Sequence, residues 1–323
     1  MSTLTYINTT YTCTANETVL DVLHAHDVAV PSSCRSGQCQ TCLMQATSGT
    51  PPAEAQKGLK DTLKAQNYFL ACCCKPNEDL EVTLPNSTTA RIKATVSNIE
   101  KLCNDIVSVS LHCESPLDYK AGQFINVFKG NTLARSYSLA SVPTQDSHLT
   151  LHVRKVPDGR MSSWIHHELR NGDSVEISLP VGDCFYTDGK PEQEMLLIGT
   201  GSGLAPLYGI ARDAIAQGHT GAIKLYHGSA NLDGLYLMDE LRQLAESHSN
   251  FSYMPCVSDE PVEMENIAQG HVLDVALAEH AKLTGYRVFL CGNPNMVKAA
   301  RKKTFLTGAA MKDIYSDAFV PAA

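Results

Sequence analysis

The spacing of apolar and polar residues divides the 323-residue chain into three blocks. In the first block, residues 1–88, a β-like run, LTYINTTYTC, precedes the segment NETVLDVLHAHD. The apolar side chains of that segment recur at helical spacing, which predicts a short amphipathic helix with Asn16 as its N-cap. The residues that form its apolar face are Val19, Leu20, Val22 and Leu23. A closing strand, LEVTLP, and a polar linker, PNSTTA, end the block.

The second block, residues 89–190, is a series of short strand-like runs separated by turn residues. RIKATVSNI, DIVSVSLHC, GQFINVF, RSYSLAS, HLTLHVRKV and DSVEISLPV have this character, and only MSSWIHHELRNG has a helical pattern. Short strands at nearly even spacing predict an antiparallel β-barrel. The third block, residues 191–323, alternates strands with helices, as in EMLLIGTGSG followed by APLYGIARDAIAQG. This alternation predicts a doubly wound parallel α/β sheet, so the chain combines α+β and α/β domains.

Composition restricts the function. Apolar residues make up 43% of the chain, charged residues 19%, and the net charge is −8. A negative charge argues against general nucleic-acid binding. The start, MSTLTYINTT, lacks the pattern of a secretory signal, and no apolar run is long enough to insert in a membrane. We therefore expect a cytoplasmic protein whose thiols stay reduced, so that its 12 cysteines indicate metal or redox chemistry.

Four cysteines have the spacing of a metal cluster. Cys34, Cys39 and Cys42 lie within CRSGQCQTC, and 29 residues separate Cys42 from Cys72. This is the spacing of the plant-type [2Fe–2S] ferredoxins, in which three thiolates converge from one tight loop. A structural zinc site usually needs a second pair of closely spaced cysteines, which only the CCC run at 72–74 could supply. The spacing thus favours an iron–sulfur cluster over zinc, and zinc over disulfides.

The CCC run offers three possible fourth ligands. In an extended segment Cys72 and Cys74 point to one side and Cys73 to the other. The spacing favours Cys72, and Cys73 and Cys74 are then expected to be small buried residues.

RSYSLAS, residues 135–141, carries residue types that suit a flavin. An arginine can neutralise a phosphate, a tyrosine can stack on an isoalloxazine ring, and a serine can hydrogen-bond near its N5. An ordinary strand with a surface arginine is the alternative. A second element supports the flavin: in HVRKVPDGRMSSW a strand joins a helix through Gly159, and the amides of Arg160, Met161 and Ser162 would form a pyrophosphate seat.

LLIGTGSGLAP, residues 196–206, is a strand that leads through glycines into a helix, where backbone amides can approach a phosphate. LCGNP ends the last clear strand, and there Asn293 can cap the next helix with Pro294 at its first position. A 2′-phosphate requires a basic side chain near the end of the second strand. No basic residue lies between Gly228 and Met238, which favours NADH over NADPH.

Together these motifs resemble the ferredoxin–NADP reductase superfamily, and in particular the reductase components of bacterial multicomponent oxygenases. The resemblance covers essentially the whole chain. It implies a plant-type ferredoxin domain with a β-grasp fold at 1–88, an FAD-binding barrel at 89–190 and an NAD(P)-binding domain at 191–323. Leu70-Ala71-Cys72 resembles the context of the fourth cluster ligand, and many relatives carry arginine where this chain has Ala230.

The resemblance also implies site residues. The cluster ligands would be Cys34, Cys39, Cys42 and Cys72. The flavin contacts would be Arg135, Ser136, Tyr137, Ser138, His152, Val153, Arg154, Gly159, Met161 and Ser162. The nucleotide contacts would be Gly201, Ser202, Gly203, Cys291 and Gly292, with Cys291 near the nicotinamide C4. Tyr137, Ser138 and Cys291 would be catalytic, and Phe319 would lie near the flavin unless the tail, with Tyr315, simply packs on the sheet.

The implied function is electron transfer from NAD(P)H through FAD and a [2Fe–2S] cluster to a partner protein. The partner is expected to be an oxygenase or hydroxylase, or its ferredoxin, and to dock near the Cys34–Cys42 loop. The ferredoxin block has five basic and eight acidic residues, which predicts a weak and salt-sensitive encounter. The alternatives are a reductase for a deoxysugar dehydratase or another metalloenzyme, and a zinc-binding interaction protein without enzymatic activity.

Overall fold

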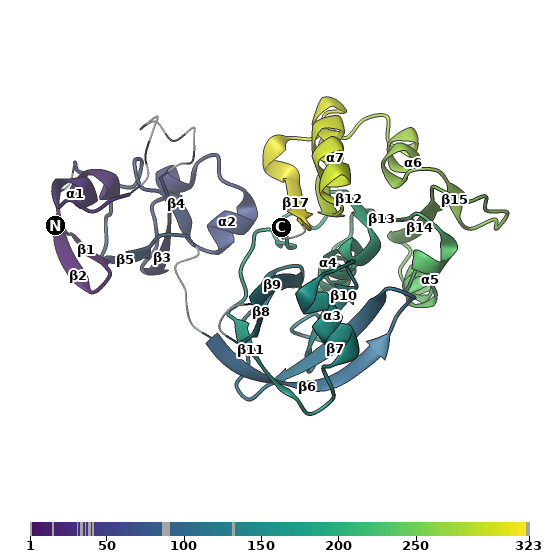
Figure 1. Ribbon diagram of the computed structural model, residues 1–323. Helices are drawn as coiled ribbons and strands as arrows, with labels where there is room; N and C mark the ends of the chain where they lie inside the picture. Colours follow the sequence, from purple (N-terminus) through teal and green to yellow (C-terminus); the bar gives the residue numbers. More distant parts are fainter. Residues whose placement is uncertain are drawn as a thin grey trace. The chain divides into compact units, whose positions relative to one another are not determined.

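The computed structural model describes residues 2–14, 16–30, 32, 35, 37, 40, 42–85, 91–130 and 133–320. The chain forms two compact units, Met1–Thr89 and Ala90–Ala323 (Figure 1). The second unit contains both the antiparallel sheet and the parallel sheet. Among the described residues, no helix is long and apolar enough to cross a membrane.

The first unit is a five-stranded mixed sheet with a helix packed against it. Its elements are β1 (Ser2–Tyr6), β2 (Thr9–Cys13), α1 (Val19–Ala25), β3 (Leu43–Ser48), η1 (Ala53–Gln56), α2 (Asp61–Ala65), β4 (Tyr68–Leu70) and β5 (Leu80–Thr83). The strand order is β2-β1-β5-β3-β4, with β1 and β5 parallel and the other neighbours antiparallel. The predicted apolar face of α1 is at most 2% exposed, so helix and sheet share one core, as a β-grasp fold requires.

The N-cap predicted for α1 is wrong. Thr18, not Asn16, caps the helix: the Thr18 hydroxyl accepts a hydrogen bond from the Asp21 amide at 3.2 Å, and the Asp21 carboxylate accepts one from the Thr18 amide. This reciprocal pair satisfies two amides that would otherwise lack partners. Because threonine and aspartate lie three residues apart here, the helix starts at Val19 rather than directly after Asn16.

An antiparallel barrel opens the second unit. Its elements are β6 (Arg91–Lys101), β7 (Ile106–Cys113), β8 (Phe124–Lys129), β9 (Leu133–Ser138), β10 (Leu149–Arg154), α3 (Arg160–His167) and β11 (Ser174–Ser178). The order is β10-β7-β6-β11-β8-β9, and a bridge between Leu139 and Leu151 links the end of β9 back to β10. The barrel interior is filled by alternate apolar side chains of these strands and by Met161 and Ile165 of α3. The predicted strands and helix are confirmed.

The parallel sheet follows. Its elements are β12 (Met195–Thr200), η2 (Gly201–Gly203), α4 (Leu204–Ala216), β13 (Ile223–Ser229), η3 (Leu232–Gly234), α5 (Met238–Ser247), β14 (Phe251–Val257), β15 (Ala268–Gln269), α6 (Val272–Glu279), β16 (Arg287–Gly292), α7 (Pro294–Leu306), η4 (Met311–Asp313) and β17 (Ile314–Ala318). The order is β15-β14-β13-β12-β16-β17. Helices α4 and α5 pack on one face and α6 and α7 on the other, which confirms the doubly wound arrangement (Figure 1).

The barrel and the parallel sheet share a core. Ile106 and Tyr186 from the barrel side pack with Leu207 and Ile210 of α4. A Cβ at Gly209 of α4 would lie only 3.0 Å from the Ala140 carbonyl oxygen, so glycine permits the close approach of helix and barrel. This shared core explains why the two parts form one unit, with the carboxyl ends of β12 and β13 held beside the barrel strand β10.

Candidate functional site

Strand β9 carries the first predicted site residues. β9 pairs with β8, and Tyr137 lies opposite Ile125 and Ser136 opposite Asn126. Burial raises the pKa of Tyr137, whose side chain is half-buried against the barrel core. The Ser136 hydroxyl donates to the Asn126 side chain at 2.7 Å, and the Arg135 guanidinium donates to the Ala134 carbonyl at 2.7 Å.

The loop that leads into α3 is compact. Gly159 is the N-cap residue, and a Cβ there would lie 2.6 Å from the Ser162 hydroxyl. That hydroxyl accepts from the Val156 amide at 3.1 Å and donates to the Gly159 carbonyl at 3.2 Å. Met161 points into the barrel core. The loop therefore presents the first amides of α3, which have no acceptor within the helix, and these amides suit a pyrophosphate.

Strand β10 presents three predicted residues in different ways. Val153 is part of the barrel core. The buried His152 ring contacts the Tyr236 hydroxyl through Nδ1 at 3.1 Å, and burial, followed by the charge of His227, lowers the pKa of His152 to about 3. The exposed Arg154 donates through Nε to Asp105 at 2.7 Å.

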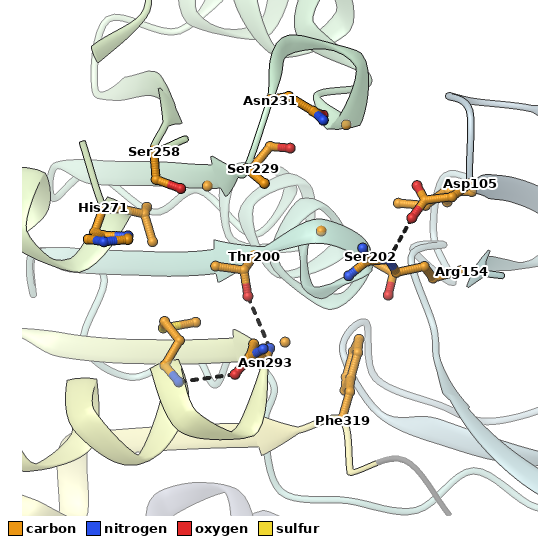
Figure 2. A pocket seen from close by; sticks show the side chains of 18 of the residues that line it. Asp105, Arg154, Thr200, Ser202, Ser229, Asn231, Ser258, His271, Asn293 and Phe319 are labelled. Atoms are coloured by element: carbon orange, nitrogen blue, oxygen red, sulfur yellow. Dashed lines mark hydrogen bonds and ion pairs between the residues drawn. The ribbon is translucent and has the colours of Figure 1, made fainter. Parts of the chain in front are cut away.

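A cavity of about 940 Å³ lies at the carboxyl ends of the parallel strands (Figure 2). Arg154, Lys155 and Asp105 line it from the barrel, and Gly201, Ser202 and Gly292 line it from the sheet. Gly201 has φ +52°, in the left-handed region that favours glycine. A Cβ at Gly203 would lie 2.4 Å from the Cys291 carbonyl oxygen. Gly201 and Gly292 therefore leave part of the wall without side chains, which fits a dinucleotide phosphate, while glycine at 203 lets the turn pack closely on the end of β16.

The helix start beside this cavity confirms the capping prediction. Asn293 accepts through its side chain from the Asn295 and Met296 amides, and Pro294 is the first residue of α7. The Asn293 amide in turn donates to the Thr200 hydroxyl at 3.0 Å (Figure 2). This bond ties the end of β12 to the end of β16, the two strand ends that line the middle of the cavity.

Cys291 lies behind the cavity wall and is fully buried. Its sulfur lies 3.8 Å from that of Cys184, which comes from the segment after the barrel. Burial and the Cys184 thiol raise the pKa of Cys291 well above its ordinary value. The Cys291 thiol is therefore neutral and can only orient or donate weakly in this state.

Asp317 is a site residue that the sequence analysis missed. The Ser138 hydroxyl donates to its carboxylate at 2.6 Å, across 179 positions of the chain. Burial raises the pKa of Asp317, and the charge of Asp183 acts in the same direction. A hydroxyl and a carboxyl group in contact can hold or move a proton at the Ser138 oxygen. The tail sequence IYSDA, which forms strand β17, has no apolar periodicity that could have pointed to this contact.

The two tail aromatics have different positions. Tyr315 is buried and stacks on Phe289 with 5.0 Å between ring centroids, so it packs on the sheet. Phe319 lines the cavity, and its amide donates to the Gly292 carbonyl at 2.8 Å (Figure 2). Phe319 is therefore the aromatic that can reach a bound cofactor.

Two of the four predicted cluster ligands lie in the described part of the chain, and they come together. The thiols of Cys42 and Cys72 interact, and the Ala71 amide donates to the Cys42 carbonyl at 3.0 Å. Burial raises the pKa of the Cys42 thiol to about 11. Cys34 and Cys39 lie outside the described residues. Among the residues that the structure describes, no three metal-ligating side chains form a group. The chemistry of the Cys42–Cys72 pair fits a [2Fe–2S] cluster.

The extended conformation predicted for the CCC run is wrong. Residues 71–73 form a turn, in which the Cys73 amide donates to the Leu70 carbonyl at 2.9 Å. Because the backbone turns, the sulfurs of Cys72 and Cys73 lie 3.7 Å apart instead of on opposite sides. A Cβ at Gly37 would lie 2.9 Å from the Cys73 sulfur, so Cys73 faces the cysteine loop. Cys74 is buried in the core, as expected.

Three family models match the chain in sequence order. They describe a 2Fe-2S iron-sulfur cluster binding domain at residues 3–77, an oxidoreductase FAD-binding domain at 93–186 and an oxidoreductase NAD-binding domain at 197–302. The chain is also 34% identical, over 96% of both chains, to the reductase subunit of an aromatic O-demethylase from Amycolatopsis. The chain belongs to the ferredoxin–NAD(P) reductase family. This reductase is also 32% identical to the ferredoxin–NAD(P)(+) reductase component of the naphthalene 1,2-dioxygenase system of Pseudomonas putida, over 95% of its length and 94% of the relative's.

A solved structure agrees with this assignment. The cytochrome P450 reductase GcoB of Amycolatopsis superimposes on the reductase with a TM-score of 0.70 at 32% identity, and 100% of both chains is covered. The predicted oxidoreductase class and its cofactors, [2Fe–2S], FAD and NAD(P)H, are confirmed. The individual contact residues and the preference for NADH stay predictions.

Proposed function

We propose that this reductase takes electrons from NADH and passes them through FAD and the [2Fe–2S] cluster to the oxygenase component of a multicomponent system. The observation that carries the proposal is the shared cavity, whose walls come from both the flavin barrel and the nucleotide sheet. The names of the relatives support the oxygenase, since they describe reductase components of dioxygenase and hydroxylase systems. When bound, FAD accepts a hydride and the cluster transfers one electron at a time.

The barrel residues of β9, β10 and α3 are proposed to bind FAD. Tyr137 would stack on the ring, and the amides that follow Gly159 would hold the pyrophosphate. The proposed contacts are Arg135, Ser136, Tyr137, Ser138, His152, Val153, Arg154, Gly159, Met161 and Ser162.

The sheet residues are proposed to bind the nicotinamide nucleotide. Gly201, Ser202 and Gly203 would line its pyrophosphate, and Gly292 and Cys291 its nicotinamide end. Ser138, held by Asp317 at 2.6 Å, would keep a proton-bearing group beside the reacting rings. Phe319 would cover that end of the cavity.

A spectroscopic experiment tests this function. The purified protein is expected to show flavin and iron–sulfur absorbance, to bleach with NADH and to reduce cytochrome c. Cys42→Ser is expected to abolish cytochrome c reduction and spare direct reduction of the flavin by NADH, since Cys42 is a proposed cluster ligand. Cys113→Ser, in the barrel, is the matched control and is expected to behave as the wild type. A colourless protein that binds zinc would refute the proposal.

The proposed docking surface is the ferredoxin unit near the Cys34–Cys42 loop, of which only Arg35, Gly37, Gln40 and Cys42 lie within the described residues. The unit has five basic and eight acidic residues, so a partner with a basic surface would approach it. The rate of partner reduction is expected to fall as sodium chloride is raised. A rate that does not depend on salt would contradict this part of the proposal.

We also propose that the reductase works in the cytoplasm and prefers NADH. The described cysteines form no disulfide, which suits a reducing compartment. Ala230 lines the cavity at the position where a basic residue would be needed for a 2′-phosphate. A comparison of kcat/KM for NADH and NADPH measures the preference directly.

A further inference from the structure

The turn that follows β13 forms the far end of the cavity. Ser229, Ala230, Asn231, Asp233 and Gly234 all line the cavity there. In Figure 2, Ser229 lies at the end of its strand with Asn231 on the loop beyond it, and Ser258 lies at the end of the neighbouring strand. The turn is tight, because a Cβ at Gly234 would lie 2.2 Å from the Ser229 hydroxyl. In doubly wound sheets, this position after the second strand meets the adenosine ribose.

The loop after β14 supports this turn from behind. The Ser258 amide donates to the Ser229 carbonyl at 3.1 Å, and the Asp259 amide donates to the Ala230 carbonyl at 2.9 Å. These two bonds extend the pairing of β13 with β14 past the end of the strands. They bring Glu260, the next residue, under the turn.

Glu260 makes a third contact between the loop after β14 and the turn after β13. Its half-buried carboxylate accepts a hydrogen bond from the Leu232 amide, at the start of η3. Glu260 is not among the residues that line the cavity, so it lies behind the turn rather than in the cavity wall. A backbone amide at such a turn is a group that a phosphate would otherwise use.

Two other charged residues that line the cavity, Asp233 and Lys303, already have partners. Asp233 lines the cavity, and its carboxylate accepts from the Asn104 side chain at 3.0 Å. The Lys303 ammonium group, which also lines the cavity, is paired with Asp274 at 2.8 Å. His271 lines the cavity near Ser258 in Figure 2, but no lysine or arginine occurs between residues 228 and 238.

We propose that Glu260 is a specificity-determining residue that disfavours NADPH. The carboxylate occupies the Leu232 amide and places a negative charge behind the site of the ribose 2′ position, where the phosphate of NADPH would bring about two further negative charges. NADH has a neutral hydroxyl there and is not affected. This inference rests on the proposed function in one respect, that the cavity holds a nicotinamide nucleotide with its ribose at the end of β13.

The test compares two nucleotides that differ only in the 2′-phosphate. Binding of 5′-ADP and of 2′,5′-ADP to the holoenzyme is measured by calorimetry, and kcat/KM is measured for NADH and NADPH. The variant is Glu260→Gln, whose amide oxygen can still accept from Leu232, so that only the charge is removed. Glu263→Gln, an exposed glutamate of the same loop, is the matched control.

The wild type is expected to prefer 5′-ADP and NADH. Glu260→Gln is expected to improve the affinity for 2′,5′-ADP and kcat/KM for NADPH by about tenfold, the effect of a nearby charge in a partly exposed site, while the values for 5′-ADP and NADH stay constant. Glu263→Gln is expected to change neither ratio. Unchanged ratios in Glu260→Gln, or a wild type without a preference for NADH, would overturn the inference. Failure of 5′-ADP to bind at all would instead refute the proposed nucleotide site.

Discussion

Acidification from pH 7 to pH 5 is expected to destabilise the second unit through two buried histidines. His152 of β10 and His227 of β13 are 7% and 0% exposed. Tyr236 lies between them: its hydroxyl contacts His152 Nδ1 at 3.1 Å, and its ring meets His227 edge-on at 5.4 Å. His227 Nδ1 contacts the Tyr253 hydroxyl at 3.4 Å, and its Nε2 has no partner among the described residues. Neutral imidazoles fit this site, and imidazolium ions do not.

The sign of the effect follows from the pKa values. Burial lowers the pKa of His227 to about 4, and burial with the charge of His227 lowers that of His152 to about 3. An unfolded histidine has a pKa of about 6.5, so between pH 6.5 and pH 4 the unfolded chain binds more protons than the folded one. The contribution of the two neutral, buried histidines to the stability of the folded state is therefore present above about pH 6.5. It is lost as the pH falls towards their folded-state pKa values.

The magnitude depends little on the folded-state values, because both lie below pH 5. From pH 7 to pH 5, protonation of the unfolded chain lowers the free energy of unfolding by about 2 kcal/mol for each histidine, or about 4 kcal/mol for the pair. This loss is large beside a typical domain stability of about 5–15 kcal/mol.

The assay is urea unfolding at pH 7 and pH 5 with saturating FAD, followed by tryptophan fluorescence. Trp164, the single tryptophan of the chain, lies in α3 and reports on the second unit alone. In His227→Asn, the amide can replace Nδ1 towards Tyr253 but does not titrate, so the loss between the two pH values is expected to be smaller by about 2 kcal/mol. His112→Asn, an exposed histidine of the barrel, is the control and should keep the full loss. An equal loss in His227→Asn and the wild type would refute the reasoning.

Four further variants test the proposed site residues. Tyr137→Ala is expected to weaken FAD binding about tenfold, because an aromatic stacking contact is lost, and a fully loaded mutant in flavin titrations would contradict the stacking role. Asp317→Asn is expected to raise thermal stability at pH 8 relative to the wild type: burial raises the pKa of Asp317, so its contribution is present below the unfolded pKa and lost as the pH rises through the folded one. A pH 8 melting temperature equal to or below that of the wild type would count against this. Cys73→Ser is expected to keep full iron content and cluster absorbance and Cys72→Ser to lose them, and iron analysis that reverses this order would assign the fourth ligand to Cys73.

Much of the fold follows from local patterns. The six barrel strands and the strand–helix pairs of the parallel sheet were predictable because each buries alternate or helical apolar positions that are visible within a few residues of sequence. Strand β14, with Pro255 inside it, and the tail strand β17 were not, since proline argues against a strand and a short terminal run has no periodicity of its own. The turn at 71–73 was missed for a related reason: three identical residues give no pattern from which to choose between extended and turned backbone.

The sequence by itself determined the cofactor chemistry, because cysteine spacing, Gly159 and the glycines at 199–203 place thiolates and free amides within single loops. Only the tertiary structure decided which distant residues contact the predicted site residues. Asp317 reaches Ser138, and Cys184 reaches Cys291, because the barrel and the parallel sheet share a core. Glu260 reaches the Leu232 amide because β13 and β14 are neighbours. Such contacts depend on strand order and packing, which no short segment of the chain encodes.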